Sequence, residues 1–381
     1  MSAWTPQSYR YEGEKQGVSP QILDAALKVI ERIQSCNQRV PIILTLRHLC
    51  TLTDTPYEYL RSVVSRTGGR YKHVRFKKKT PGRSRYREVH IPQEYLFYVQ
   101  KWISHEILRN TTAHSASHAY HPNSHPEYAA TRHCGCRWLL KFDIEDFFHA
   151  ISERKIYFAF RELGYPRLLC FELARITTIL PPDQRQEHPT KFEKHRAIKS
   201  YNNIDEGFLP QGAPTSPMLS NLVMRSIDNE LDLLAASKNF IYTRYSDDLT
   251  FSTTDNISLK DIKSFRKSVF SILQMNDFKI NRSKTAIRGP GARRIVLGVL
   301  VDRPTPRLSK EYKNNLRLHL YYLCSPNIGP SKHAIARKMS ISSLYHHIYG
   351  KILWAKRIEP HYGDSCLEIF KSISWPPFDI K

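Results

Sequence analysis

Two adjacent acidic residues, Asp247 and Asp248, carry the clearest chemical signal in the sequence. They lie in the segment IYTRYSDDLTFS, where apolar and β-branched residues flank them on both sides. Such a run predicts a hairpin, with one strand ending near Tyr245, a tight turn at the acids and a second strand over residues 249–252. Adjacent carboxylates repel each other and resist burial without a counter-charge, which Mg²⁺ can supply. Because Asp is also a common turn residue, the pair alone does not separate a metal site from an ordinary turn.

A third carboxylate belongs to Asp143, which follows a short apolar strand predicted over residues 139–142. Together with the Asp247-Asp248 pair it would supply three carboxylates for two metal ions. Two-metal chemistry holds both ions a few Å apart, so that one activates the attacking hydroxyl and the other holds the leaving group.

The elements that must position these acids alternate between helices and mostly antiparallel strands. Apolar residues at helical spacing, together with capping residues, predict helices over residues 19–35, 55–66, 93–109, 152–163, 168–180, 214–237 and 258–275. A further strand is predicted over residues 294–301, a loop over residues 181–206, and mostly helix from about residue 306. Because the regular rhythm of βαβ units is missing, the predicted fold class is α+β.

Residues 70–87 form a very basic segment, RYKHVRFKKKTPGRSRYR, with a turn signal at its middle. The pattern predicts two strands flanking a basic loop. Three Tyr or Phe side chains between the cations favour a hairpin that contacts phosphate. A solvated charged face is the alternative.

Composition narrows the class of partner. The chain has 381 residues, and its 58 Lys and Arg exceed its 35 Asp and Glu, giving a net charge of +23. Such an excess predicts a polyanionic partner, most simply nucleic acid.

No apolar run approaches the ~18 residues of a membrane span, and the polar N-terminus lacks a signal region, so we expect a cytoplasmic protein without a membrane partner. Seven scattered cysteines do not predict a disulfide framework, and the HCGC segment at residues 133–136 has no second pair for a zinc site.

Five segments resemble the motifs of reverse transcriptases, in that family's order. They are FDIEDFF for motif A, LPQGAPTSPMLSN for motif B, YSDD for motif C, INRSKT for motif D and RRIVLGVLV for the primer-grip strand. QGAPTSPMLSN followed by YSDD is the most specific combination. The segments LGYPR and Gly350-Lys351-Ile352 make the resemblance one to bacterial retron-type reverse transcriptases, and it covers roughly residues 40–360.

The resemblance implies a right-hand polymerase with fingers, an antiparallel palm sheet and a helical thumb. Residues 1–39 would form an N-terminal helical extension, and residues 40–137 the fingers. Residues 138–304 would form the palm with inserted fingers elements, and residues 305–381 the thumb and C-terminal helices. Since the chain ends within about seventy residues of the thumb's start, we expect no RNase H domain.

The resemblance also assigns metal ligands. Asp143, Asp247 and Asp248 would hold two Mg²⁺ ions, with Mn²⁺ as an alternative, and the main-chain carbonyl of Ile144 would be a further ligand. Lys284 matches the motif D lysine, a candidate proton donor to pyrophosphate, and its alternative is a surface lysine after a strand. The family's metal site includes neither Glu145 nor Asp146.

Other residues would contact the substrates. The expected nucleotide-binding set is Lys78 or Lys79 and Arg87 at the triphosphate, Phe148 as the steric gate that favours dNTP over rNTP, and Gln211 and Gly212 lining the pocket. Phe148 could instead be a core aromatic residue. The expected nucleic-acid contacts are Tyr245 at the primer end and Lys310, Lys313 and Arg317 on a thumb helix along the duplex backbone. A solvated helix face is the alternative for these three.

Two segments depart from the retron pattern. Retron enzymes usually carry Asn-Ala-x-x-His before motif A, whereas the matching segment of this chain has Ala129 in place of the Asn. They also carry Val-Thr-Gly after motif D, where this chain has Val296-Leu297-Gly298. In the family, both elements are associated with recognition of the retron's own RNA. Their alteration leaves room for a related defence-associated reverse transcriptase.

The expected function is RNA-directed DNA synthesis, in which a DNA or RNA primer is extended with dNTPs on a non-coding RNA template. The resemblance implies a DNA product, a role in anti-phage defence and an effector or second protein of the defence system. Two alternatives stay open. One is untemplated or protein-primed DNA synthesis on the same palm, and the other is a catalytically inactive RNA-binding protein.

Overall fold

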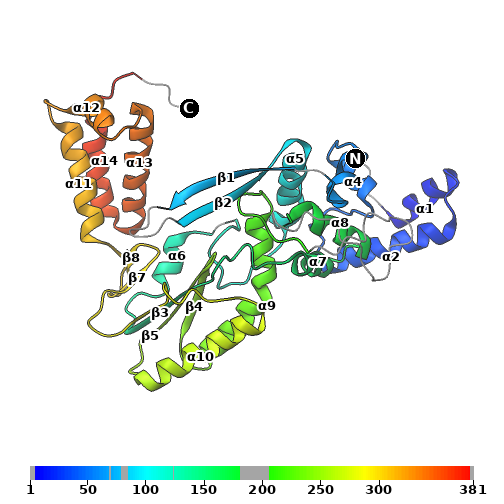
Figure 1. Cartoon of the computed structure of the whole chain (residues 1–381), viewed down its shortest axis with the longest axis horizontal. Coiled ribbons are helices and arrows are strands. Elements are labelled where there is room, and N and C mark those ends of the chain that lie inside the picture. The colour runs from blue at the N-terminus through cyan, green and yellow to red at the C-terminus, as the bar shows by residue number, and fades with distance from the viewer. Residues whose placement is uncertain (1–4, 68–69, 79–84, 123, 181–205, 378–381) are drawn as a thin grey trace. The chain divides into compact units, whose positions relative to one another are not determined.

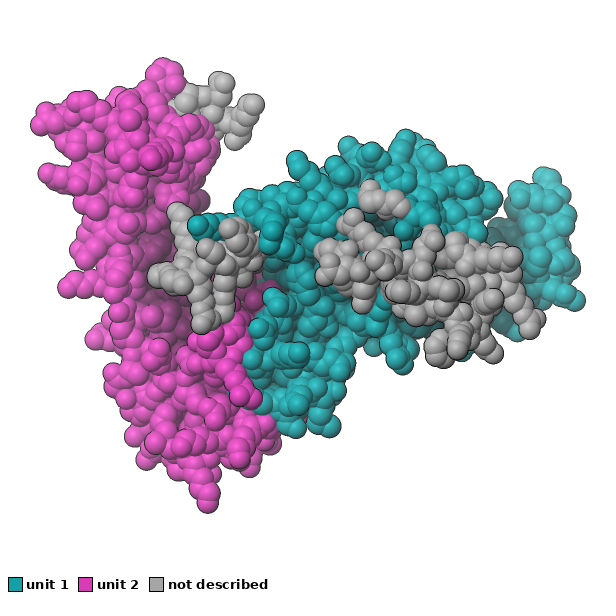
Figure 2. Space-filling view, viewed as in Figure 1, with its two compact units in different colours: residues 1–123, 144–231, 269–280 teal, residues 124–143, 232–268, 281–381 magenta. Residues whose placement is uncertain are grey.

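The computed structural model describes residues 5–67, 70–78, 85–122, 124–180 and 206–377. Lys79 and nearly all of the loop expected over residues 181–206 lie outside these ranges. The chain divides into two compact units, which Figure 2 colours separately. The first unit comprises residues 1–123, 144–231 and 269–280, and the second comprises residues 124–143, 232–268 and 281–381.

The first unit is mainly helical and carries one long hairpin (Figure 1). Its helices are α1 Pro6–Lys15, α2 Pro20–Cys36, α3 Leu46–Leu52, α4 Tyr57–Val64, α5 Glu94–Trp102, α7 Glu153–Glu162 and α8 Arg167–Thr177. After α5 the chain continues as a π-helix over Ile103–Ile107 and a 3-10 turn over Leu108–Asn110. The hairpin pairs β1 Tyr71–Lys78 with β2 Arg85–Pro92 in antiparallel register, which confirms the strands predicted around the basic loop.

A buried ionic cluster joins elements of the first unit. The Glu153 carboxylate at the start of α7 accepts hydrogen bonds from the guanidinium of Arg66 and, at 3.2 Å, from Nε of Arg175 on α8. The Thr178 hydroxyl donates to the same carboxylate at 3.2 Å. Because two cations and a hydroxyl compensate it, Glu153 can remain buried at the junction of these helices.

The second unit contains the predicted antiparallel sheet. Its strand order is β4-β5-β3-β6, formed by β4 Ile241–Tyr245, β5 Asp248–Thr253, β3 Trp138–Asp143 and β6 Ala286–Arg288, with every pair antiparallel. The short helix α6 Pro126–Thr131 precedes β3. Two long helices, α9 Ser216–Ala236 and α10 Leu259–Met275, contribute residues to both units. The mixture of helices and antiparallel strands confirms the α+β class.

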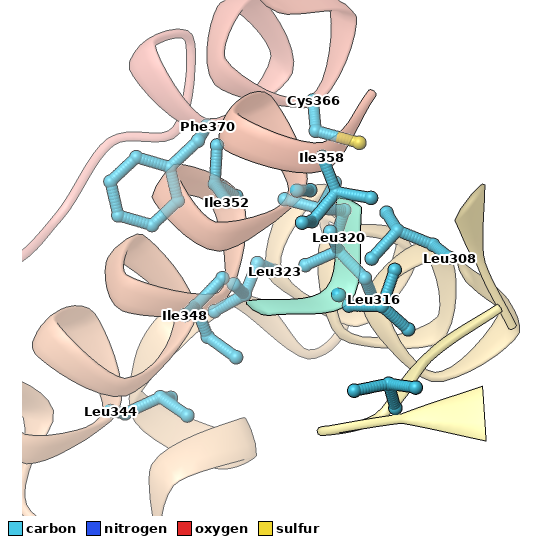
Figure 3. Packing of buried hydrophobic residues seen from close by; sticks show 14 of the residues in the cluster. Leu308, Leu316, Leu320, Leu323, Leu344, Ile348, Ile352, Ile358, Cys366 and Phe370 are labelled. Carbon is cyan, nitrogen blue, oxygen red and sulfur yellow. The ribbon is translucent and has the colours of Figure 1, made fainter. Parts of the chain in front are cut away.

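The rest of the second unit is a small sheet and a group of four helices. These elements are β7 Ile295–Val296, β8 Val299–Leu300, β9 Arg307–Leu308, α11 Lys310–Cys324, α12 Gly329–Ala336, α13 Ile341–Ile358 and α14 Pro360–Lys371. One apolar cluster holds the helices together, and Figure 3 shows Leu316 and Leu320 of α11 packed with Ile348 and Ile352 of α13. Ser309 and Ser340 start α11 and α13 as N-caps, each accepting a backbone N–H bond three residues on.

The prediction of one continuous strand over residues 294–301 was wrong. The segment folds back on itself as the β7–β8 hairpin, because Leu297 and Gly298 both adopt left-handed backbone angles, φ 48° and 85°. Positive φ at two consecutive residues is the requirement of a type I′ hairpin turn. The apolar run RIVLGVLV therefore contains a turn, and the glycine was the only residue in it that indicated one.

Among the described residues, every helix is too short or too polar to cross a lipid bilayer.

The helical cluster predicts a sharp contrast between two neighbours on α13. Ile352 is fully buried, whereas Leu353 is 40% exposed. We expect Ile352→Ala to lower the free energy of unfolding of this unit by about 2–5 kcal/mol, because it removes buried methyl groups and leaves a cavity. Chemical denaturation measures the change. Leu353→Ala is the control and should shift the midpoint little. Equal effects of the two substitutions would contradict the packing described.

Candidate active site

Three aspartates come together where strands β3 and β5 meet. Asp143 is the last residue of β3 and Asp248 is the first of β5, and the two are direct partners in the antiparallel register. Directly opposed residues on neighbouring strands place their side chains on the same face, with Cβ atoms about 5 Å apart. Asp247 immediately precedes Asp248 in the β4–β5 turn. The structure therefore brings together the three carboxylates that the sequence singled out.

A buried arginine forms a hydrogen bond with the turn that presents Asp247. Tyr245 pairs with Asp248, so that only Ser246 and Asp247 form the connection. Ser246 adopts φ 60°, a left-handed angle that costs a non-glycine residue energy. Arg244 is fully buried on β4 and donates from Nη1 to the Ser246 carbonyl at 3.2 Å. Nothing in the sequence pattern had marked Arg244 as part of the site.

Burial makes two of the carboxyls hard to ionise. It raises the pKa of Asp247 above the ordinary value of 3.8, and the neighbouring Asp143 carboxylate raises it further, while Lys284 acts in the opposite direction. Burial likewise raises the pKa of Asp248, where Lys141 is the main opposing charge. Lys141 lies two residues before Asp143 on β3, so its side chain projects from the same face of the strand. The sequence analysis missed it, although strand alternation could have found it.

Lys284 is the cation in direct contact with the cluster. Its Nζ donates to Oδ2 of Asp143 at 2.7 Å. The same segment is fixed to β3 through the backbone, because the N–H of Asn281 donates to the Asp143 carbonyl at 2.8 Å. Asp143 is almost completely buried, whereas the Lys284 side chain is half exposed. The INRSKT segment therefore reaches the aspartates, while the role of Lys284 as proton donor to pyrophosphate stays a prediction.

The donor set of the cluster fits a hard divalent cation. Carboxylate oxygens are the ligands that Mg²⁺ prefers, and desolvated carboxylates gain most from a cation. Among the described residues, no group of three His, Cys, Asp or Glu side chains is already arranged to hold a metal ion. In this arrangement the Asp143 carboxylate is paired with the ammonium group of Lys284.

His133, the last residue of the segment that departs from the retron pattern, is buried beside the sheet of the second unit. Both ring nitrogens of His133 form hydrogen bonds, Nδ1 with the Ser252 hydroxyl at 2.6 Å and Nε2 with the Thr243 hydroxyl at 2.7 Å. Ser252 lies on β5 and Thr243 on β4, so the ring joins the two strands that flank the Ser246-Asp247 turn. With no solvent-exposed surface, His133 has a structural role in this fold.

The motif B residues Gln211 and Gly212 lie against the β1–β2 hairpin. The His90 N–H donates to the Gln211 carbonyl at 2.7 Å. A Cβ atom on Gly212 would lie 2.4 Å from Cγ1 of Val89, and the residue has φ 107°. Both observations explain why glycine is required here. The predicted triphosphate residues Lys78 and Arg87 lie on the same hairpin.

The remaining predicted residues divide between solvent and internal partners. Phe148 is partly exposed, with its ring centroid 6.4 Å from that of Tyr120. Ile144 is buried and bridges to Ile280. On α11, Lys310 and Arg317 are exposed, although Arg317 also lies over the Tyr362 ring. Lys313 forms an ion pair with Glu359 and lies over the same ring. Tyr245 is partly exposed at the end of β4. Sequence spacing could not have revealed the Lys313 partner, which is 46 residues away.

The family described as "Reverse transcriptase (RNA-dependent DNA polymerase)" matches residues 76–300, more than half of the chain and the span that carries the three aspartates. The chain belongs to this family. It is of the retron type and is an RNA-directed DNA polymerase. Retron Ec86 reverse transcriptase of Escherichia coli is 28% identical over 339 residues, which are 88% of this chain and 96% of that protein. Retron Mx65 reverse transcriptase of Myxococcus xanthus is 28% identical over 278 residues, 73% of this chain and 60% of that protein.

Among solved structures, the foamy viral protease–reverse transcriptase in complex with double-stranded DNA is 12% identical. The match covers 79% of this chain and 38% of that chain, with a TM-score of 0.41. The antiparallel sheet that carries the aspartates, the β1–β2 hairpin and the helical C-terminal part agree with the right-hand polymerase fold expected for the family. Reverse transcriptases in general use divalent metal ions such as Mg²⁺.

The raised pKa values of Asp247 and Asp248 predict how stability depends on pH without divalent ions. Because the folded state favours the protonated carboxyls, the free energy of unfolding falls as pH rises from below 3.8 through the raised pKa values. Asp247→Asn removes one of these groups. We therefore expect this variant to be more stable than the wild type at pH 7, with a difference that shrinks toward pH 3.

Chemical denaturation in the presence of a chelator measures this difference. Saturating Mg²⁺ should raise the unfolding temperature of the wild type more than that of the Asp247→Asn variant, since a ligand stabilises the state that binds it. Glu145→Gln, at an exposed neighbouring acid, is the control and should behave as the wild type. A variant that is less stable at pH 7 would contradict the electrostatic description.

Proposed function

We propose that Asp143, Asp247 and Asp248 are the catalytic metal ligands of this reverse transcriptase. One observation carries the proposal: Asp143 and Asp248 face each other across β3 and β5, with Asp247 beside them in the turn. Two Mg²⁺ ions bound there, or Mn²⁺ in their place, would activate the primer 3′-hydroxyl and neutralise the leaving pyrophosphate. The carbonyl of Ile144 would be a further ligand. The three carboxylates would hold the two ions at the end of the sheet.

Lys284 would have two successive roles. In the free enzyme its ammonium neutralises the Asp143 carboxylate, which supports a partly compensated cluster before substrates bind. Once that carboxylate is engaged by metal, the half-exposed lysine side chain would turn to the pyrophosphate. There it would supply a proton as general acid.

Nucleotide selection would depend on residues that follow or face these motifs. Phe148, five positions after Asp143, would exclude a ribose 2′-hydroxyl. Gln211 and Gly212 would line the nucleotide pocket, and Arg87 with Lys78 or Lys79 would bind the triphosphate. The proposal for motif B is supported by the close packing of Gly212 on Val89, which leaves no space for a side chain.

We assign the parts of the hand as the family implies. Residues 1–39 are an N-terminal extension, residues 40–137 form the fingers, residues 138–304 the palm with inserted fingers elements, and residues 305–381 the thumb. Tyr245 would lie at the primer end, and Lys310 and Arg317, with Lys313, would follow the duplex backbone.

The substrates would be dNTPs and a non-coding RNA that serves as template and provides or accepts the primer, and the product would be DNA. The net charge of +23 supports a large polyanionic partner. The names of the bacterial relatives support a retron-like role in defence, with an effector protein as partner. In place of the retron Asn, Ala129 is buried, and Leu297 forms a hairpin turn where retron enzymes have Thr. The RNA of this enzyme would therefore differ from a standard retron RNA.

Primer extension tests the metal assignment. We expect Asp247→Ala combined with Asp248→Ala to lower dNTP incorporation on an RNA template by at least about 100- to 1,000-fold, because metal ions contribute several kcal/mol to such transition states. Incorporation that persists in the double variant would contradict the assignment. Glu145→Gln is the matched control and should retain activity. Reactions without template distinguish templated from untemplated synthesis. Analysis of the 5′ end of the product shows whether the DNA is linked to protein.

The gate proposal predicts a change in sugar selectivity. Phe148→Ala should lower the ratio of kcat/KM for a dNTP to that for the corresponding rNTP by at least about tenfold, because the smaller side chain admits the 2′-hydroxyl. Single-nucleotide incorporation with both substrates measures the ratio, which is insensitive to the fraction of folded enzyme. An unchanged ratio would assign Phe148 to packing alone.

A further inference from the structure

Three histidine side chains, the histidine cluster, lie together in the first unit at the open end of the β1–β2 hairpin. His90 on β2 and His73 on β1 are direct partners in the antiparallel register, and their Nδ1 atoms are 2.7 Å apart. The ring of His149, the residue after Phe148, lies 6.2 Å from the His90 ring, centroid to centroid. Phe208, which precedes motif B, stacks on His149 with a centroid distance of 4.6 Å. The cluster therefore joins the hairpin to the segments that carry the proposed gate and motif B.

The backbone of His90 connects the cluster directly to motif B. Its N–H donates to the Gln211 carbonyl at 2.7 Å, so this N–H points away from β1. In an antiparallel ladder, His73 and His90 are therefore a non-hydrogen-bonded pair, the kind in which opposing side chains lie closer together. The preceding residue, Val89, packs where a side chain on Gly212 would lie. Two consecutive residues of β2 thus contact the two motif B residues that we assign to the nucleotide pocket.

The hydrogen bond between the two imidazoles requires that one Nδ1 donates and the other accepts. The His90 side chain is 2% exposed, and its Nε2 is buried without a partner among the described residues. An additional proton on His90 would place a charge in this buried position, where the Nε2–H group has no acceptor. Protonation of His90 is therefore incompatible with the packing of β2 as it stands.

The groups around His90 favour its neutral form. Among the described residues, the titratable and charged side chains that face the cluster from β1, β2 and the segment after β3 are His73, Arg75, Glu88, Asp146 and His149. Burial lowers the pKa of His90 to about 4, and the rings of His73 and His149 act in the same direction. Glu88 acts in the opposite direction, but it also forms an ion pair with Arg75 at 3.3 Å.

We propose that His90 is a positioning residue: its neutral imidazole, paired with His73, holds β2 against motif B, and its protonation releases motif B and weakens dNTP binding. The proposal rests on the assignment of Gln211 and Gly212 to the nucleotide pocket. A solvated imidazole has a pKa near 6.5, so the released form binds a proton between about pH 6.5 and 4, whereas the engaged form does not. The engaged form therefore loses stability relative to the released form as the pH falls, by about tenfold per pH unit in this range.

Hydrogen exchange at the amide of residue 90 measures this equilibrium, because the N–H meets solvent only when its bond to Gln211 is broken. After correction for the intrinsic exchange rate, we expect the wild-type protection to fall by about 10- to 30-fold between pH 6.5 and pH 5. His90→Asn should abolish this fall, because the Asn amide can reach the Nδ1 position and does not titrate. The Leu209 amide, which donates to the Ile151 carbonyl, is the internal control and should behave alike in both proteins.

The affinity for dNTP is measured on a primer–template whose primer ends in a dideoxynucleotide, so that no chemistry occurs. Between pH 6.5 and pH 5, we expect the wild-type Kd to rise at least about threefold more than that of His90→Asn, because fewer molecules are competent to bind. Titration of the dNTP and of the aspartates is common to both proteins and cancels in this comparison. His90→Ala should bind dNTP more weakly than His90→Asn at every pH. His361→Asn, at an exposed histidine of α14, is the matched control and should behave as the wild type.

Equal pH dependence of the dNTP affinity in the wild type and His90→Asn would overturn the proposal. Loss of protection at residue 90 without any loss of affinity would overturn it as well. Gln211→Ala tests the pocket assignment separately, because this variant keeps the backbone carbonyl that accepts from His90. Unchanged dNTP affinity in Gln211→Ala would contradict the assignment of Gln211, whereas the comparison of the wild type with His90→Asn decides the role of His90.

Discussion

Mutual repulsion among Asp143, Asp247 and Asp248 is the constraint on which the four-stranded sheet of the second unit depends. Three carboxylates meet where β3 ends and β5 begins, and burial makes the ionised forms of the last two still less favourable. No isolated hairpin would hold such a cluster, because separating the strands would relieve both the repulsion and the lost hydration. The surrounding fold must supply the opposing free energy.

Several interactions provide it. Lys284 supplies positive charge to Asp143 and Lys141 to Asp248, and the backbone bond from Asn281 fixes the INRSKT segment to the end of β3. His133 joins β4 and β5 through two hydroxyls, and Arg244 holds the carbonyl of the strained Ser246. The cluster is therefore short of cationic charge, which a divalent cation would supply.

The sequence predicted much of this arrangement, for identifiable reasons. The alternation of apolar residues around Asp247 and Asp248 allowed only a hairpin with the acids at its tip, and the helical spacing of α9 and α10 was unambiguous. Contacts between distant residues were not predictable. The bonds of His133 to Thr243 and Ser252 span more than 100 residues, and no local pattern marks them. The turn at Leu297 was missed because leucine rarely adopts positive φ, so an apolar run containing it was expected to continue as a strand.

Manganese binding gives the most direct measurement of the central claim, that these three aspartates hold the catalytic ions. Electron paramagnetic resonance can count Mn²⁺ bound to the full-length enzyme with primer–template and a non-hydrolysable dNTP. The account predicts two bound ions in the wild type. It also predicts that Asp143→Asn weakens both, since Asp143 faces Asp248 and lies beside Asp247. An Asp143→Asn enzyme that binds Mn²⁺ with unchanged number and affinity would contradict it.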